Sequence, residues 1–391
     1  MSYMNFMPIP WPYVFWLEKS QIKHQTGPHA APNRRAAPPV RRHHGAILHN
    51  MQAGLLVGAV LLAWVSAATA FDATLDSGDA KLHVYVEDAR FELPYGRIVA
   101  WVQRSSDVVS DYFGGFPVEE AYVAVTGQPG KGVMNGIALG SGEAVVNVKL
   151  GLDTDERDLS NDWVLVHELI HLAFPKVHTR HHWAEEGLAV YVESVARVQA
   201  GRIDAETLWM HFVDGMPNGL PQEGDRGLDN TPTWGRTYWG GALFYLLADI
   251  DIIRRTGGDK TLKNGLRAIV GEGYSIRDSL EIKHIYRIAD RATGVPVLLE
   301  TYESMADRPA SVDLVLLWRR LGVERTVSGV VFHENAEWAG VRTKISAGKN
   351  AKNMAKFSKN AISISQRRRN LVMGNDGDRI ERAVAIYPGK R

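Results

Sequence analysis

The stretch VLVHELIHLAFP, Val164–Pro175, sets two histidines four residues apart in an apolar run, with a glutamate directly after the first. On a helix, residues i and i+4 lie on one face about one turn apart, so His167 and His171 can present both imidazoles to one metal ion. Glu168 lies about 100° around the helix, which suits it to reach a metal-bound water and not to act as a third ligand. Ordinary core histidines are the alternative, but burying three ionisable groups without a function is costly. The pattern H-E-x-x-H therefore predicts a metal site.

A third ligand is expected from a second helix, because catalytic zinc sites use three protein ligands and leave one position for water. The chain has no cysteine, so its metal ligands must be His, Asp or Glu. The segment WAEEGLAVYVE, Trp183–Glu193, offers Glu186 on the first turn of a helix that can run back antiparallel to the first. The neighbouring carboxylate and three histidines of the connection stay open as alternatives: Glu185, His178, His181 and His182.

The pattern before residue 158 predicts a small sheet, and the pattern after it predicts helices. Strands are expected at Leu82–Asp88, at EAYVAVTG and at Ala144–Val148, with a helix over Phe91–Phe113 and a glycine-punctuated loop before the last strand. The fold class we expect is α+β, with a small N-terminal sheet packed on a mainly helical domain. The active cleft should lie between the two, with Ala144–Val148 at its edge, where an extended peptide can add as a strand.

Charge is unevenly distributed along the 391 residues. Residues 1–50 carry six Lys/Arg and one acidic residue, residues 341–391 carry thirteen and three, and residues 51–340 carry 26 and 40. The acidic middle argues against nucleic acid as the partner. After about residue 349 the periodicity dissolves into Lys, Asn, Ser and Arg, so 350–391 is expected to be a basic, disordered tail.

The segment Met51–Ala70 predicts export. It has no charged residue, follows Arg41 and Arg42, and ends in the small-x-small triplet Ala68-Thr69-Ala70, the layout of a secretory signal peptide cleaved before Phe71. Because the apolar stretch is near the lower limit for a membrane span, an uncleaved anchor is the alternative. Residues 1–50 are a basic, Pro/His/Arg-rich leader, or lie upstream of a true start at residue 51. We expect a folded domain over 71–349 in the periplasm or outside the cell, with membrane contact only through the signal segment.

HELIH followed by W-x-x-E-G-x-A-x-Y-x-E resembles the gluzincin metallopeptidases, the superfamily that includes thermolysin-like and zinc aminopeptidase-like enzymes. The resemblance covers Ala144–Gly258 and implies a thermolysin-like zincin domain with one Zn²⁺ per chain. The glutamate directly before glycine is the third zinc ligand in that group, which implies Glu186. The segment from Thr237 is similar to the family's Y-x-x-G-A segment, whose tyrosine stabilises the oxyanion, which implies Tyr238 as a catalytic residue beside Glu168.

Two departures from the family bear on specificity. Fourteen residues separate His171 from Glu186, where the family commonly has about eighteen, so the connection is short. The exopeptidase branch carries a G-x-M-E-N strand that holds the substrate amine, whereas Gly132–Gly136 reads GVMNG.

The expected function is zinc-dependent hydrolysis of a peptide or protein substrate. A catalytically lapsed zinc-binding scaffolding protein of the cell envelope is the alternative, against which the intact Glu168 argues. A third hypothesis is a membrane-tethered envelope protein whose basic ends contact anionic lipid and whose HELIH helix is structural.

Overall fold

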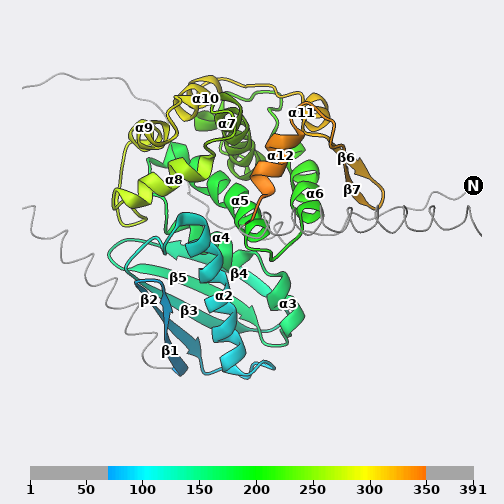
Figure 1. Cartoon of the computed structure of the whole chain (residues 1–391). Helices are drawn as coiled ribbons and strands as arrows, with labels where there is room; N and C mark the ends of the chain where they lie inside the picture. The colour runs from blue at the N-terminus through cyan, green and yellow to red at the C-terminus, as the bar shows by residue number, and fades with distance from the viewer. Residues whose placement is uncertain (1–68, 349–391) are drawn as a thin grey trace, which may run out of the picture.

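A five-stranded mixed sheet forms the N-terminal layer of this computed structural model, which describes residues 69–348 (Figure 1). Its strands are ordered β1-β2-β3-β5-β4. The central strands β2, β3 and β5 are parallel, while β1 and β4 are antiparallel to their neighbours and form the two edges. The strand bounds are β1 Thr69–Ser77, β2 Ala80–Glu87, β3 Glu120–Gln128, β4 Val133–Leu139 and β5 Ala144–Gly151.

One face of the sheet carries the apolar side chains that alternate along its strands. Leu82, Val84 and Val86 of β2 are buried, while the residues between them are partly exposed. Helix α2 (Tyr95–Phe113) packs on the sheet with a buried stripe that includes Trp101 and Val109. Helix α4 packs against α2, β4 and β5, so it lies at the β4 side of the same layer.

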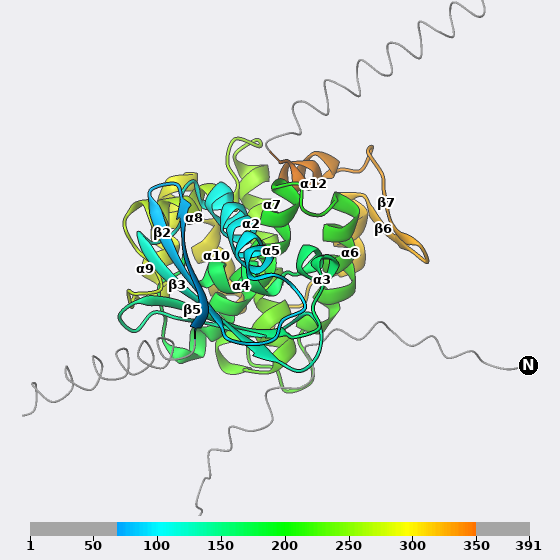
Figure 2. The same cartoon turned by 90° about the horizontal axis from the view of Figure 1, so that it is seen from below.

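The helical layer follows in the chain and, apart from α3, lies above the sheet in Figure 1, and Figure 2 shows it from below. Its α-helices are α3 Glu156–Asn161, α4 Val164–His171, α5 His182–Gln199, α6 Ala205–Gly215, α7 Gly241–Arg255, α8 Leu262–Gly271, α9 Ile282–Thr293, α10 Val297–Met305, α11 Leu314–Leu321 and α12 Ala339–Ser346. Short helical turns join them: η2 Thr179–His181, η3 Met216–Gly219, η4 Leu228–Asn230 and η5 Arg236–Gly240. A hairpin of β6 (Val323–Thr326) and β7 (Gly329–Phe332) precedes α12.

The expected α+β class, a small N-terminal sheet with a mainly helical remainder, is confirmed. The expectation that Ala144–Val148 lies at the cleft edge is wrong, because β5 is an internal strand paired with both β3 and β4. The edge strand is β4, in the stretch predicted to be a loop. Its glycine disfavours a strand in isolation, yet a Cβ on Gly136 would lie 2.5 Å from Glu168 Cγ, so only glycine lets α4 pack this closely.

The expectations for residues 1–50 and for the tail 350–391 lie outside the described residues, as does the signal segment apart from its last two residues. None of the helices in the described part, 69–348, is long and apolar enough to cross a membrane.

Candidate metal centre

Asp162 fixes the N-terminus of helix α4 and directly precedes the N-cap residue, Trp163. The carboxylate accepts hydrogen bonds from the backbone N–H groups of Val164 and Leu165, and the Trp101 indole of α2 donates to it. These bonds satisfy helix donors that have no partner within the helix. Burial raises the pKa of Asp162 to about 6 in spite of them. The helix that carries His167 therefore starts at a defined point, held to the layer that packs on the sheet.

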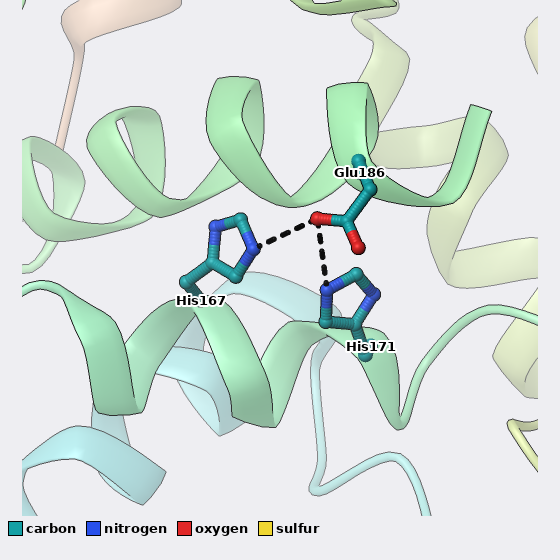
Figure 3. A group of neighbouring side chains, drawn as sticks. All are labelled: His167, His171 and Glu186. Carbon is teal, nitrogen blue, oxygen red and sulfur yellow. Dashed lines mark hydrogen bonds and ion pairs between the residues drawn. The ribbon is translucent and has the colours of Figure 1, made fainter. Parts of the chain in front are cut away.

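Three side chains from α4 and α5 converge on one point (Figure 3). His167 Nε2 lies 3.3 Å from Glu186 Oε2, and His171 Nε2 lies 3.6 Å from the same oxygen. The three possible ligand atoms all lie within 4.8 Å of one another. The structure thus brings together the two histidines of HELIH and the glutamate of the second helix, across a connection of fourteen residues.

The donor set fits zinc. Two imidazole nitrogens and one carboxylate oxygen are ligands of catalytic zinc sites, and bonds of about 2.0–2.2 Å in a tetrahedron separate neighbouring donors by about 3.3–3.6 Å. The N–O distances of 3.3 and 3.6 Å match that spacing. Electrostatics agree. Burial alone would lower the pKa of His171, but the Glu186 carboxylate overrides it and raises the pKa to about 9. The site therefore attracts positive charge.

Glu168 lies on the side of α4 that meets the edge strand. Its side chain packs against the backbone of Gly136, and burial raises its pKa above the ordinary value, although the two neighbouring histidines act in the opposite sense. Glu168 is not part of the group that converges on Glu186 Oε2. A buried carboxylate beside the site, with a pKa above its ordinary value, is a stronger base than an exposed one and is suited to act as a general base.

Tyr238 lies on η5, a single π-helical turn before α7. It lines the same cavity as His167. Burial raises the pKa of Tyr238, and the Glu186 and Glu168 carboxylates add to this, so the hydroxyl stays protonated and can donate a hydrogen bond. Single π-helical turns inside helices are frequent at functional sites. The sequence pattern around Tyr238 carries no sign of this π turn.

Two glycines, Gly187 and Gly241, bring η5 and α7 close to α5, the helix that carries Glu186. A Cβ on Gly187 would lie 2.3 Å from Gly241 Cα, and a Cβ on Gly241 would lie 2.2 Å from the Trp183 carbonyl oxygen. Helices α5 and α7 therefore cross backbone to backbone, one residue after Glu186 and three residues after Tyr238. This contact explains in physical terms why glycine follows the glutamate.

The alternative ligands have other partners. Glu185 accepts a hydrogen bond from the Val177 backbone N–H, and His178 accepts one from the Arg180 backbone N–H. His181 is buried, with Nδ1 2.7 Å from Asp229 Oδ1. His182 contacts Glu185 through Nδ1 and also lies beside the converging group, without being part of it.

Sequence reasoning missed Asp229, a buried carboxylate on η4 that braces the start of α5. Besides His181, it accepts hydrogen bonds from the Trp183 indole at 2.7 Å and from the Tyr302 hydroxyl at 2.8 Å. Burial would raise the pKa of Asp229, but these hydrogen bonds lower it below its ordinary value, so the carboxylate stays charged. No local signal reveals it, because the partners lie 46 to 73 residues away in the chain.

Comparison with known proteins supports the fold. No family model matches the chain, and no curated protein sequence matches it. Among solved structures, it is similar to an aminopeptidase N family protein from Idiomarina loihiensis, with a TM-score of 0.50 and 12% identity over 65% of this chain and 49% of that one. An M1 zinc metallopeptidase from Deinococcus radiodurans gives a TM-score of 0.40 and 18% identity over 63% and 52%.

The first of these similarities shows that the described residues share their fold with the aminopeptidase N family protein. The resemblance inferred from HELIH and the second glutamate is therefore confirmed at the level of the fold. The chain spans about half the length of the solved structures that it matches.

Proposed function

We propose that this protein is a zinc-dependent peptidase. The observation that carries the proposal is the convergence of His167 and His171 on Glu186 Oε2, at 3.3 and 3.6 Å, with Glu168 beside them under the edge strand. Zinc held by these three residues would act as a Lewis acid and lower the pKa of a bound water towards about 7.

Two residues of the chain would then act on the substrate and the attacking water. Glu168 takes the proton from the attacking water and passes it to the leaving amine. The Tyr238 hydroxyl, kept protonated, donates a hydrogen bond to the carbonyl oxygen as negative charge develops on it. Both groups are largely buried, and this strengthens their electrostatic effect on the reacting atoms.

A peptide substrate is proposed to lie along β4. This strand pairs with β5 on one side only, so its other edge has main-chain groups that can pair with an extended peptide. Because Gly136 of β4 packs against Glu168, a peptide paired there would place its backbone next to the proposed base. The strand-addition surface expected from the sequence is thus moved from β5 to β4.

A cavity next to His167 is the proposed pocket for a substrate side chain. Its aromatic and aliphatic walls are formed by Trp163, Val190, Trp234, Tyr238 and Trp239, and its polar lining by Glu193, Ser194 and His211. The Arg197 guanidinium lies 3.4 Å from the Glu193 carboxylate and neutralises its charge. His167 Nδ1 is buried and has no hydrogen-bond partner among the described residues. We propose that the pocket takes an uncharged side chain.

Metal analysis and turnover together test the function. Protein purified without chelator should contain about one zinc per chain, lose it to a chelator, and cleave members of an unbiased peptide library only when zinc is present. Bound zinc without turnover would support the scaffolding alternative. A content of less than about a tenth of an equivalent of any transition metal per chain would overturn the zinc site. The remaining hypothesis would then be a membrane-tethered envelope protein whose HELIH helix is structural.

A further inference from the structure

We propose that His182 is a positioning residue that holds Glu186 as a monodentate metal ligand; this inference rests on the zinc site proposed above. His182 is the first residue of α5 and lies one helical turn before Glu186. The sequence leaves His182 open as an alternative third ligand. The geometry assigns it the role of a positioning residue instead.

The two carboxylate oxygens of Glu186 have separate neighbours. Oε2 faces both proposed histidine ligands, at 3.3 and 3.6 Å. Oε1 lies 3.4 Å from His182 Nε2. A free carboxylate can bind a metal through one oxygen or both, and can rotate between the two modes. With His182 beside Oε1, only Oε2 is left to face the metal.

His182 is itself held from behind. Its other ring nitrogen, Nδ1, lies 3.1 Å from Glu185 Oε2. The remaining oxygen, Glu185 Oε1, accepts a hydrogen bond from the Val177 backbone N–H at 3.3 Å. A series of polar contacts therefore runs from the short connection through Glu185 and His182 to Glu186. Partners of this kind, which orient metal ligands, typically change metal affinity by about 10–100-fold when they are removed.

The solvent exposure of the His182 side chain indicates that the residue contributes little to the stability of the fold. The His182 side chain is 54% exposed, whereas that of Glu186 is 14% exposed. Exposed contacts of this kind contribute little to stability. Substitution of His182 should therefore leave the fold unchanged and alter the metal site.

The test uses the full chain with His182→Ala and His182→Gln, the second of which keeps an N–H near the position of Nε2. His333→Ala is the matched control, because His333 makes an exposed contact with Glu324 at 2.7 Å in the β6–β7 hairpin. Three quantities are measured: the zinc Kd by chelator competition, the visible spectrum of the cobalt-substituted protein, and the thermal midpoint of the metal-free protein.

We expect His182→Ala to weaken zinc binding by about 10–100-fold and to change the cobalt spectrum in the direction of higher coordination number, with an unchanged metal-free midpoint. His182→Gln should recover most of the affinity, and His333→Ala should match wild type in all three. An unchanged Kd and spectrum in His182→Ala would overturn the inference alone. So would X-ray absorption showing one imidazole fewer around the metal, which would make His182 a ligand. A wild-type chain that binds no metal would overturn the proposed function as well.

Discussion

Gly187 and Gly241 touch backbone to backbone, and this contact fixes the distance between the helix that carries Glu186 and the turn that carries Tyr238. A Cβ on Gly187 would lie 2.3 Å from both the Cα and the carbonyl carbon of Gly241, and neither atom can move without the helix. The two proposed functional side chains come from segments about fifty residues apart in the chain. The crossing is what brings them to one site.

Gly187→Ala should therefore separate α5 from α7. The expected cost is about 1–3 kcal/mol of unfolding free energy, the usual range for overpacking, with a fall in zinc affinity because Glu186 moves with its helix. Denaturant unfolding and zinc titration measure the two effects. Gly96→Ala on α2, where a Cβ meets nothing within 4 Å, is the control and should be neutral or slightly stabilising. Equal effects of the two substitutions would contradict the argument.

Glu168→Gln should separate proton transfer from metal binding. The amide cannot take a proton, so kcat should fall by about 10²–10⁴, the range typical for loss of a general base. Zinc content and thermal midpoint should stay close to wild type, because the residue is not in the ligand group. Loss of zinc from this variant would show that the residue is a ligand and that the assignment is wrong.

Glu186→Ala should remove zinc and activity together. It should also lower the thermal midpoint of the zinc-loaded protein, because the metal links α4 to α5. Glu185→Ala is the neighbouring control: it should keep one zinc per chain at saturating zinc, with an affinity between those of wild type and His182→Ala. Zinc retained in Glu186→Ala but lost in Glu185→Ala, or in a variant lacking His178, would reverse the assignment.

Asp249, buried in α7, should make stability depend on pH. Burial raises its pKa from 3.8 to about 6, in spite of hydrogen bonds from the Leu262 backbone N–H and the Tyr191 hydroxyl. Since the folded chain holds this proton more tightly, its contribution to stability is present below about pH 4 and is lost as pH rises through 6. The loss amounts to about 3 kcal/mol, at 1.36 kcal/mol per pKa unit.

Asp249→Asn keeps an acceptor for the backbone N–H and removes the titration. The stability difference between this variant and wild type should shift by about 2 kcal/mol in favour of the variant between pH 4 and pH 7. Urea unfolding at a series of pH values measures it. A difference that does not change with pH would mean that Asp249 does not titrate in this range.

Processing is predicted to leave Phe71 as the first residue of the exported protein. The described part of β1 is compatible with this, because Phe71 to Ser77 pair with Val86 to Ala80 of β2 without help from Thr69. N-terminal sequencing of protein from the native host decides it. A membrane-embedded chain that keeps Gly54–Ala70 would instead establish the anchor.

The parts of the site that were predictable are those encoded by local spacing. The i, i+4 relation of His167 and His171 places both on one side of a helix, and the short connection brings the next helix back with Glu186. That these residues bind zinc stays a prediction. The edge strand β4 was not predictable, since the glycine at 136 suggests a loop until the packing of Glu168 against it is seen.

The other features that the sequence did not predict, Asp229 and the π turn at Tyr238, depend on contacts with residues distant in the chain. Asp229 has no periodic context, and the residues that it holds come from η2, α5 and α10. The π turn η5, which carries Tyr238, packs against α5, a contact that hydrophobic periodicity does not encode. Tertiary contacts override local preference at these positions.

The Asp229 brace also sets an order of events in biosynthesis. A chain that emerges N-terminus first presents HELIH and Glu186 early, whereas Tyr302 follows Asp229 by 73 residues. Until α10 has docked, the start of α5 lacks one of its supports. The three residues proposed to bind zinc should accordingly reach their final positions late, so the proposed peptidase should become active only after Tyr302 has been synthesised and packed.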